Sequence, residues 1–319
     1  MNSVRGKYLV TGAAGFIGSN LIDALLKDGN EVVGVDNFIT GKRKNIKPFL
    51  SSIQFIEGDI RDIKTCRDVC NGVDYVLHQA ALGSVPRSIE DPISSNEHNI
   101  TGTLNMLVSA KEAKVKRFVY ASSSSVYGDT EILPKVETMN TNPLSPYAVS
   151  KYVSELYGKL FWSIYGLPTI GLRYFNVFGR NQDPDGMYAA VIPRFIKKIL
   201  SGESPEIFGD GEQTRDFTYI DNVIQANLRA CQANEEAFGE VMNIGAGGRI
   251  SINELTSKIL SLLDSNILPK NVSARDGDVR DSQANIEKAR KLIGYKPEIS
   301  ALEGLERAIA WYQKILNPT

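Results

Sequence analysis

Residues 10–18, which read VTGAAGFIG, decide the fold. The apolar run 7–10 before them predicts a strand, and the amphipathic run 16–27 predicts a helix. Three glycines at a spacing of three residues suit a tight turn that brings the backbone close to a pyrophosphate at a helix N-terminus. A purely structural strand-to-helix turn is the alternative. We expect a dinucleotide to contact Gly12, Gly15, Phe16, Ile17 and Gly18.

Short apolar runs alternate with helical patterns through the first half of the chain. Strands are predicted at 7–10, 31–35, 53–57, 73–77, 117–121 and 169–172, and helices at 16–27, 62–70, 102–113 and about 147–165. Strands that are apolar almost throughout, with helices between them, indicate a parallel sheet covered on both faces. The predicted fold class is therefore α/β, with a Rossmann-type doubly wound sheet.

The alternation weakens after residue 180. A capping box at 251–254 predicts a helix to about residue 263, and 301–315 is typical of a final amphipathic helix. We therefore predict two domains, 1–180 and 181–319, with an approximate boundary and segments that can interleave. The second is expected to be a smaller α/β lobe packed on the first.

Charge and composition exclude several classes of protein. The 36 basic and 37 acidic residues are scattered, and the net charge of −1 gives no electrostatic case for nucleic acid or an anionic membrane. A short basic cluster at 41–44 is either a solvated loop or a contact for a nucleotide phosphate. No signal peptide or spanning apolar run is expected.

The three cysteines are odd in number and show no CxxC spacing, which favours a reducing cytoplasm. Core packing is the preferred interpretation of Cys66 and Cys70. His78 is interpreted as a packed, hydrogen-bonded histidine, and His98 is expected in a polar loop. Because no histidine pair has ligand spacing, we expect no metal site.

Residues after the next three strands suggest the rest of a dinucleotide site. Asp36 ends the second strand, where a carboxylate would bind a ribose hydroxyl and repel a 2′-phosphate, so NAD is favoured over NADP. Asp59 and Ile60 could flank the adenine. The small Ala80 and Ala81 would let a cofactor lie close to the backbone.

Tyr147 and Lys151 stand four residues apart on one predicted helix face. A phenol is a weak base at neutral pH, but a nearby ammonium and a positive nicotinamide ring both favour phenolate. Such a phenolate could remove a hydroxyl proton while hydride leaves the same carbon. An amphipathic helix without chemistry is the alternative.

These residues together resemble the extended short-chain dehydrogenase/reductase family. The resemblance rests on the glycine loop, Asp36, the serine run 122–125, Tyr147 with Lys151, and the segment 173–179 (RYFNVFG), and it spans essentially the whole chain. It implies bound NAD in the first domain, a nucleotide sugar gripped by the second, and a homodimer formed through helices at about 99–113 and 147–165.

Within the family the chain resembles UDP-sugar 4-epimerases, especially those acting on UDP-N-acetylglucosamine and UDP-N-acetylgalactosamine. The segments 80–88, 179–184 and 277–282 carry this likeness. Family dehydratases usually have Thr-Asp-Glu where this chain has serines. Serine hydroxyls cannot easily supply the acid and base for dehydration, which argues against a 4,6-dehydratase.

The resemblance also implies roles for single residues. Ser123 and Tyr147 would contact the sugar 4-OH with Tyr147 as base, and Lys151 would hold the nicotinamide ribose. Further cofactor contacts are expected from Asn37, Asn99 and Tyr174, and further substrate contacts from Gly83, Ser84, Ser124, Ser125, Asn176, Ala190, Val191, Ile207, Arg215, Arg275 and Ser282. The two arginines would bind the diphosphate, unless they are surface ion pairs, and residues 190–193 and 207–209 would hold uracil.

Ser282 falls where the family sets sugar size, and a serine leaves room for an N-acetyl group without excluding glucose and galactose. The alternatives are a UDP-hexuronate 4-epimerase or decarboxylase, a nucleotide-sugar reductase, and a non-catalytic nucleotide-binding protein. A non-catalytic relative would often lack the tyrosine or the lysine, and this chain has both.

Overall fold

The computed structural model describes residues 3–186, 189–273 and 279–316. β1 (Lys7–Thr11) lies inside a parallel sheet because its run KYLVT is buried on both faces. In spatial order the seven strands of this sheet are β11 (Val241–Ile244), β6 (Thr169–Tyr174), β5 (Arg117–Ser123), β4 (Tyr75–His78), β1, β2 (Glu31–Asp36) and β3 (Gln54–Glu57). The order reverses at β1, so the sheet is doubly wound.

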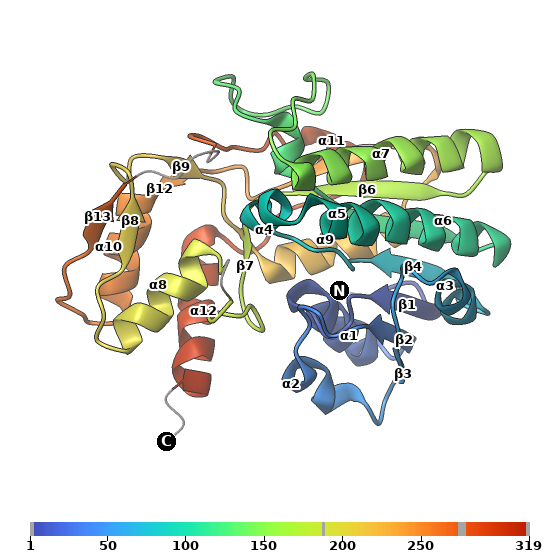
Figure 1. The fold of residues 1–319 in the computed structure, drawn as a ribbon, viewed down its shortest axis with the longest axis horizontal. Helices are drawn as coiled ribbons and strands as arrows, with labels where there is room; N and C mark the ends of the chain where they lie inside the picture. The colour runs from blue at the N-terminus through green and yellow to red at the C-terminus, as the bar shows by residue number, and fades with distance from the viewer. Residues whose placement is uncertain (1–2, 187–188, 274–278, 317–319) are drawn as a thin grey trace.

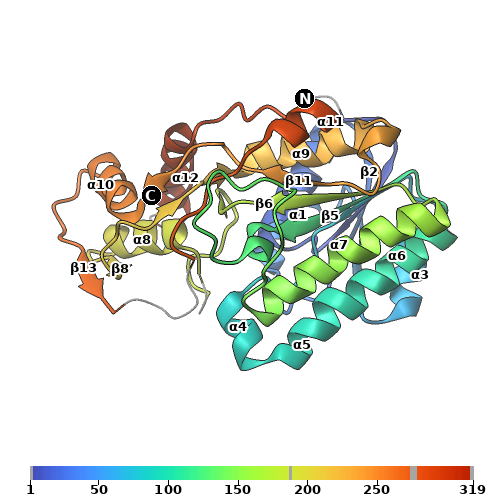
Figure 2. The same ribbon diagram turned by 90° about the horizontal axis from the view of Figure 1, so that it is seen from above.

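Helices cover both faces of the sheet. One layer holds α3 (Ile63–Cys70), α6 (Gly102–Glu112) and α7 (Pro146–Tyr165), and the other holds α1 (Phe16–Lys27), α9 (Ile220–Gln232) and α11 (Glu287–Ile293) (Figure 2). The three-layer arrangement confirms the predicted Rossmann-type fold class. It brings the carboxyl ends of the strands to one edge, where ligands bind in such sheets.

α7 is well delimited by its sequence. The Ser145 hydroxyl accepts a hydrogen bond from Ala148 N at 3.2 Å, Pro146 occupies the first turn, and Gly166 ends the helix in the left-handed region with φ 67°. Serine at the N-cap and glycine after the last turn are both favoured choices. This capping fixes where the first turn of α7 lies relative to the strand ends.

A second lobe lies beyond one end of the sheet (Figure 1). It contains α8 (Val191–Leu200), α10 (Ile252–Leu262) and α12 (Ala301–Leu316), with the strand pairs β8 (Glu206–Phe208) with β13 (Lys270–Val272) and β9 (Thr214–Arg215) with β12 (Ile250–Ser251). Ser251 caps α10 as predicted, because Glu254 N donates to the Ser251 hydroxyl at 3.1 Å.

The chain returns to the sheet after residue 180. α9 packs on β5 and β6, and β11 pairs in parallel with β6 at the edge of the sheet. The division at residue 180 therefore stays an approximate prediction, with 220–244 lying in the sheet layers. The short strands β7 (Val177–Phe178) and β10 (Thr218–Tyr219) pair where the chain passes between lobe and sheet.

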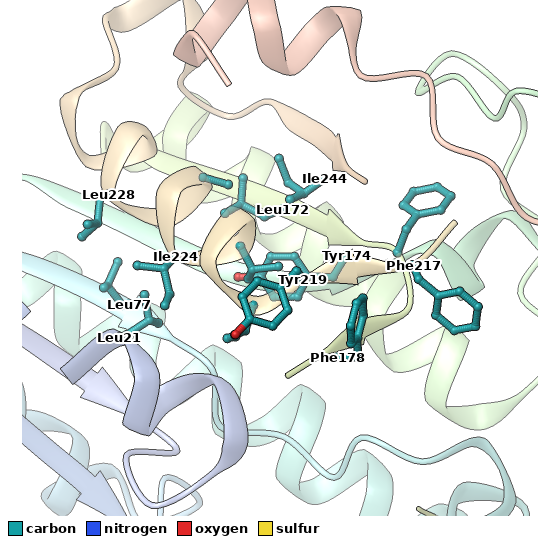
Figure 3. Packing of buried hydrophobic residues seen from close by; sticks show 14 of the residues in the cluster. Leu21, Leu77, Leu172, Tyr174, Phe178, Phe217, Tyr219, Ile224, Leu228 and Ile244 are labelled. Carbon is teal, nitrogen blue, oxygen red and sulfur yellow. The ribbon is translucent and has the colours of Figure 1, made fainter. Parts of the chain in front are cut away.

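A continuous apolar core joins the sheet to the second lobe (Figure 3). Leu172 of β6 and Ile224 of α9 lie in the same buried cluster as Phe178 and Tyr219. Phe178 and Tyr219 contact edge to face at 5.6 Å. Full burial of one such side chain stabilises the fold by about 1.5–3 kcal/mol.

The predicted packing of the cysteines is confirmed, since Cys66, Cys70 and Cys231 are all buried free thiols. Burial raises the pKa of Cys66 to about 12. The prediction for His98 is wrong, because His98 is buried in a helical turn, η2 (Glu97–Thr101), and lies 2.8 Å from the Ser94 carbonyl through Nδ1. Across the described ranges no helix is long and apolar enough to cross a membrane.

Candidate active site

A cleft of about 1390 Å³ opens at the carboxyl ends of the parallel strands and extends into the second lobe. Many of the predicted site residues line it: Gly12, Gly15, Phe16, Ile17, Gly18, Asp36, Asn37, Ile60, Ala80, Ala81, Gly83, Ser84, Ser123, Ser124, Ser125, Tyr147, Lys151, Tyr174, Asn176, Ala190, Val191, Arg215 and Ser282. The fold therefore brings together residues that lie far apart in the sequence.

Three predicted contacts are not among the described residues that line the cleft. The Asn99 amide accepts from Leu82 N at 2.8 Å and donates to Leu82 O at 3.2 Å, so it holds the loop after β4. Asp59 accepts from the Asn37 amide at 3.0 Å, and Ile207 is buried. Their ligand contacts stay predictions. Arg275 lies outside the described residues.

The glycine loop allows the protein backbone to come close to a phosphate group of a ligand. Gly12 has φ +66°, and a Cβ on Gly18 would lie 2.1 Å from the Gly12 carbonyl oxygen. Helix α1 starts at Phe16, so its first N–H groups have no acceptor within the helix. These donors face a cleft at the positive end of the helix dipole, which suits the pyrophosphate of NAD.

Asp36 lies at the end of β2, beside this loop. Its carboxylate accepts from Ala14 N at 2.9 Å and from Phe38 N at 2.7 Å. Burial raises its pKa, although these two hydrogen bonds oppose the rise. A carboxylate has further lone pairs free for ribose hydroxyls, and it would repel a 2′-phosphate. The residues present therefore suit NAD.

His78 is held as predicted, in the interior of the sheet. Its Nδ1 lies 2.8 Å from the Thr11 hydroxyl and its Nε2 lies 3.0 Å from the Thr103 hydroxyl. Burial lowers the pKa of His78 to about 3, so the ring is neutral. The Thr11 hydroxyl also accepts from Ala80 N at 3.1 Å and fixes the turn at the cofactor side of the cleft.

The serine run does not stay extended. β5 ends at Ser123, and Ser124–Tyr127 form a short 3-10 helix, η3, capped by Ser123. The Ser123 hydroxyl accepts from Ser125 N at 3.2 Å and from the Ser125 hydroxyl at 2.9 Å. Ser122 also lines the cleft, and its hydroxyl donates to Glu155 at 2.5 Å. Ser123 is thus both a helix cap and a residue of the cleft wall.

Tyr147 and Lys151 stand on the first turns of α7 at the mouth of the cleft. The Lys151 ammonium donates to the Ala121 carbonyl at 2.9 Å and lies 5.9 Å from the centre of the Tyr147 ring. Burial lowers the pKa of Lys151 to about 8, so the amine is mainly charged at neutral pH. Burial raises the pKa of Tyr147, and a hydrogen bond with Ser123 opposes the rise.

On the substrate side, Asn176 and Ser282 lie together. The Asn176 amide donates to the Asp216 carbonyl at 3.0 Å and to the Ser282 hydroxyl at 3.3 Å. The Asp216 side chain is buried and accepts from three backbone N–H groups of the second lobe, at 2.9–3.0 Å. Arg215 lines the cleft, and its guanidinium donates to the Arg280 carbonyl at 2.8 Å.

The segment 180–183 crosses from the second lobe to α1, and the site prediction did not include it. Asn20 donates to the carbonyl of residue 180 at 3.0 Å, and the amide of residue 181 donates to Ser19 at 3.1 Å. Lys42 pairs with Asp183 at 3.0 Å. The basic cluster at 41–44 thus provides a link between the lobes beside the cofactor end of the cleft. Nowhere in the described ranges do three or more His, Cys, Asp or Glu side chains gather closely enough to hold a metal ion.

Comparison with known proteins identifies the family to which the chain belongs. The model of the NAD dependent epimerase/dehydratase family matches residues 8–245. A protein of Methanocaldococcus jannaschii, provisionally named a UDP-glucose 4-epimerase, is 42% identical over 309 residues, which cover 95% of this chain and 97% of that protein.

Two solved structures share the fold over nearly the whole chain. UDP-N-acetylglucosamine 4-epimerase from Methanobrevibacter ruminantium M1, in complex with UDP-N-acetylmuramic acid, has a TM-score of 0.93 and 40% identity, covering 99% of this chain and 100% of that one. UDP-glucuronic acid 4-epimerase from Bacillus cereus, in complex with UDP-glucuronic acid and NAD, has a TM-score of 0.89 and 36% identity, covering 97% and 99%. NAD is confirmed as the cofactor, and the protein belongs to the NAD dependent epimerase/dehydratase family.

Proposed function

We propose that the protein is an isomerase that inverts C4 of a UDP-hexose with NAD as its cofactor. UDP-N-acetylglucosamine and UDP-N-acetylgalactosamine are the proposed main substrates, with UDP-glucose and UDP-galactose also accepted. The observation that carries this proposal is that Ser123, Tyr147 and Lys151 line one cleft with the glycine loop. The likeness to proteins named as UDP-sugar 4-epimerases supports it.

The chemistry assigned to the chain is proton transfer at the sugar 4-OH. Bound NAD would accept a hydride from C4 and return it. The Tyr147 phenolate removes the 4-OH proton, and the Ser123 hydroxyl holds the oxygen in place. Since burial alone raises the pKa of Tyr147, the Lys151 ammonium has to favour the phenolate.

Inversion requires that the ketone formed at C4 present its other face to the same hydride. The nucleotide part is therefore held while the sugar turns about its diphosphate link. Asn176 and Arg215 on the substrate wall, and Arg275 by resemblance, are the proposed diphosphate contacts. Residues 190–193 and 207–209 are the proposed uracil contacts, and Ala190, Val191, Ile192 and Phe208 of these segments line the cleft in the second lobe.

Product analysis tests this assignment. The purified protein is incubated with UDP-glucose, UDP-N-acetylglucosamine and the matching uronate, without added NADH, and the products are resolved by NMR. The expected result is the C4 epimer of the N-acetyl sugar. Turnover that starts only when NADH is added would identify a reductase. Carbon dioxide release from the uronate would identify a decarboxylase.

A UDP-hexuronate 4-epimerase is the second candidate function. It is favoured by the likeness to the Bacillus cereus structure, which contains UDP-glucuronic acid. The same NMR experiment separates the two, because only a hexuronate epimerase would convert UDP-glucuronic acid faster than UDP-N-acetylglucosamine.

Replacement of Ser282 by tyrosine is expected to shift the sugar preference. Ser282 is 8% exposed, lines the cleft and lies against Asn176, so a phenol ring there would occupy the space proposed for the C2 substituent. We expect kcat/KM to fall at least about tenfold for UDP-N-acetylglucosamine and much less for UDP-glucose. Steady-state kinetics on both sugars measure this. An equal loss on both would remove Ser282 from the specificity argument.

We also propose the homodimer that the family resemblance implies. On α7, Val149, Leu156, Leu160 and Ile164 are 43–64% exposed and recur at helical spacing. Leu160→Glu together with Ile164→Glu is expected to convert the dimer to a monomer in sedimentation equilibrium, because two charges would enter an apolar interface. Leu268→Glu, at a site 80% exposed on the second lobe, is the matched control. A wild-type monomer, or a dimer that survives both changes, would contradict the proposal.

The cytoplasmic location and the lack of nucleic-acid and membrane partners stay predictions from composition and charge.

A further inference from the structure

A buried ion pair lies directly behind the catalytic end of β5. Glu155 follows Lys151 by one turn of α7 and faces Arg173 of β6. Arg173 Nε donates to Oε1 of Glu155 at 2.8 Å, and Nη2 donates to Oε2 at 2.6 Å. The two side chains are 5–6% exposed. The bonding is bidentate, which fixes both the distance and the orientation of the pair.

Ser122 is the third member of this network. Its hydroxyl donates to Oε1 of Glu155 at 2.5 Å. Ser122 and Arg173 are direct partners in the parallel register of β5 and β6. One carboxylate therefore ties two neighbouring strands to α7, immediately before the serine that ends β5 and one turn after Lys151.

Arg173 also supports the turn that follows Ser123. Its guanidinium carbon lies 4.7 Å from the centre of the Tyr127 ring in η3. The Tyr127 hydroxyl donates to the Asn243 amide oxygen at 2.7 Å. Since Ser123 caps η3, the network holds both the cap and the helix that carries Tyr147.

Stability does not explain why such a pair is buried here. Removing two charges from water costs several kcal/mol per ion, and replacing a buried ion pair by apolar side chains is often neutral or stabilising. Burial lowers the pKa of Arg173, but the hydrogen bonds that Arg173 donates to the Glu155 carboxylate keep this pKa above its ordinary value. Neither Glu155 nor Arg173 is among the described residues that line the cleft.

We propose that Glu155 and Arg173, with Ser122, are positioning residues that set the separation between Ser123 and Tyr147. Glu155 and Arg173 act through β5, η3 and α7 from behind the cleft wall, whereas Ser122 joins their network from a position that lines the cleft. This inference rests on the proposed function, because its kinetic test measures the proposed epimerisation. A misplacement of a catalytic group by about 1 Å costs about 100-fold in turnover, so loss of the network is expected to act on kcat.

The test is the double variant Glu155→Leu/Arg173→Met, which replaces the pair by apolar side chains and leaves no unpaired charge. We expect kcat to fall about 30- to 100-fold, KM to stay within about threefold, and Tm to stay unchanged or rise. Arg173→Lys as a single change keeps the positive charge but loses the bidentate guanidinium contact. Its kcat is therefore expected to lie between that of the double variant and that of the wild type. A double variant with wild-type kcat would overturn the proposal, and so would a fall in kcat matched by a fall in Tm.

The matched control is Arg117→Met, at the opposite end of β5. Arg117 is also buried, donates to the Ala233 carbonyl at 2.8 Å and lies 3.7 Å from the Phe238 ring centre. The turnover of the Arg117→Met variant is expected to match that of the wild type. If the double variant does not fold, Arg173→Lys tests the same point from outside the cleft, with kcat expected to fall several-fold at unchanged KM. Unchanged kcat in Arg173→Lys would contradict the proposal.

Amide hydrogen exchange separates failure of this inference from failure of the proposed function, because it needs no substrate. We expect faster exchange at 123–127 and 147–151 in the double variant and not in Arg117→Met. A wild-type protein that epimerises nothing, together with this exchange pattern, would contradict the proposed function alone. Normal exchange in the double variant would contradict the positioning role whatever the activity.

Discussion

Tyr147→Phe is expected to lower turnover by at least about 1000-fold while leaving NAD binding intact. General base catalysis contributes about 10²- to 10⁴-fold to turnover. Tyr147 is the one described residue to which we assign removal of the 4-OH proton. The substitution removes one oxygen and keeps the ring, so the shape of the cleft wall is unchanged. Lys151 also keeps its hydrogen bond to the Ala121 carbonyl.

Single-turnover and steady-state kinetics, with NAD binding measured by calorimetry, check this expectation. Tyr152→Phe, on the same helix and packed against the core, is the control and should retain turnover. Near-normal turnover in Tyr147→Phe would remove Tyr147 from the role of base. Loss of NAD binding together with activity would show that the phenol acts mainly on the cofactor.

Gly18→Ala is expected to weaken NAD binding strongly and to lower Tm. A Cβ at this position would lie 2.1 Å from the Gly12 carbonyl oxygen and 2.8 Å from the Gly12 carbonyl carbon, both of which are backbone atoms. Overpacking commonly costs about 1–3 kcal/mol, and here the strain falls on the loop that would hold the pyrophosphate. We therefore expect NAD affinity to fall at least about 100-fold.

Calorimetric titration with NAD and a thermal melt measure both effects. Gly248→Ala is the matched control, because a Cβ there meets nothing within 4 Å and the residue does not line the cleft. A Gly18→Ala protein that binds NAD as the wild type does would contradict the packing argument for the third glycine.

Most of the sheet domain follows from local pattern. The runs at 7–10, 31–35 and 117–121 are apolar and short, and all three appear as parallel strands at nearly the predicted bounds. β11 (Val241–Ile244) was not predicted. It is four residues long, it follows a region of weak alternation, and its place beside β6 depends on a contact with residues about seventy positions earlier.

The serine run shows where a local pattern fails. In an extended strand, side chains alternate between the two faces, so Ser123 and Ser125 would share a face if the chain stayed extended. The Ser123 hydroxyl instead accepts from Ser125 N, and this local hydrogen bond stabilises a 3-10 turn in place of the strand. Both Ser122 and Ser123 line the cleft, but Ser122 is bonded to Glu155 and Ser123 caps the turn.

The positioning network and the segment 180–183 could not be found from spacing alone. Glu155 follows Lys151 by four residues, a common helical pattern, and nothing local identifies Arg173 as its partner. The contacts of 180–183 with α1 join residues about 160 positions apart. Such pairs depend on the assembled fold, whereas the glycine loop and the Tyr-Lys pair carry their signal within a few residues.

The most direct test of the central claim uses UDP-N-acetylglucosamine labelled with deuterium at C4. The proposed reaction removes hydride from C4 and returns it to the same carbon, so the UDP-N-acetylgalactosamine formed in ordinary water should keep its deuterium, as read by NMR without added NADH. A product that carries solvent hydrogen at C4, or the absence of any C4 epimer, would contradict the account.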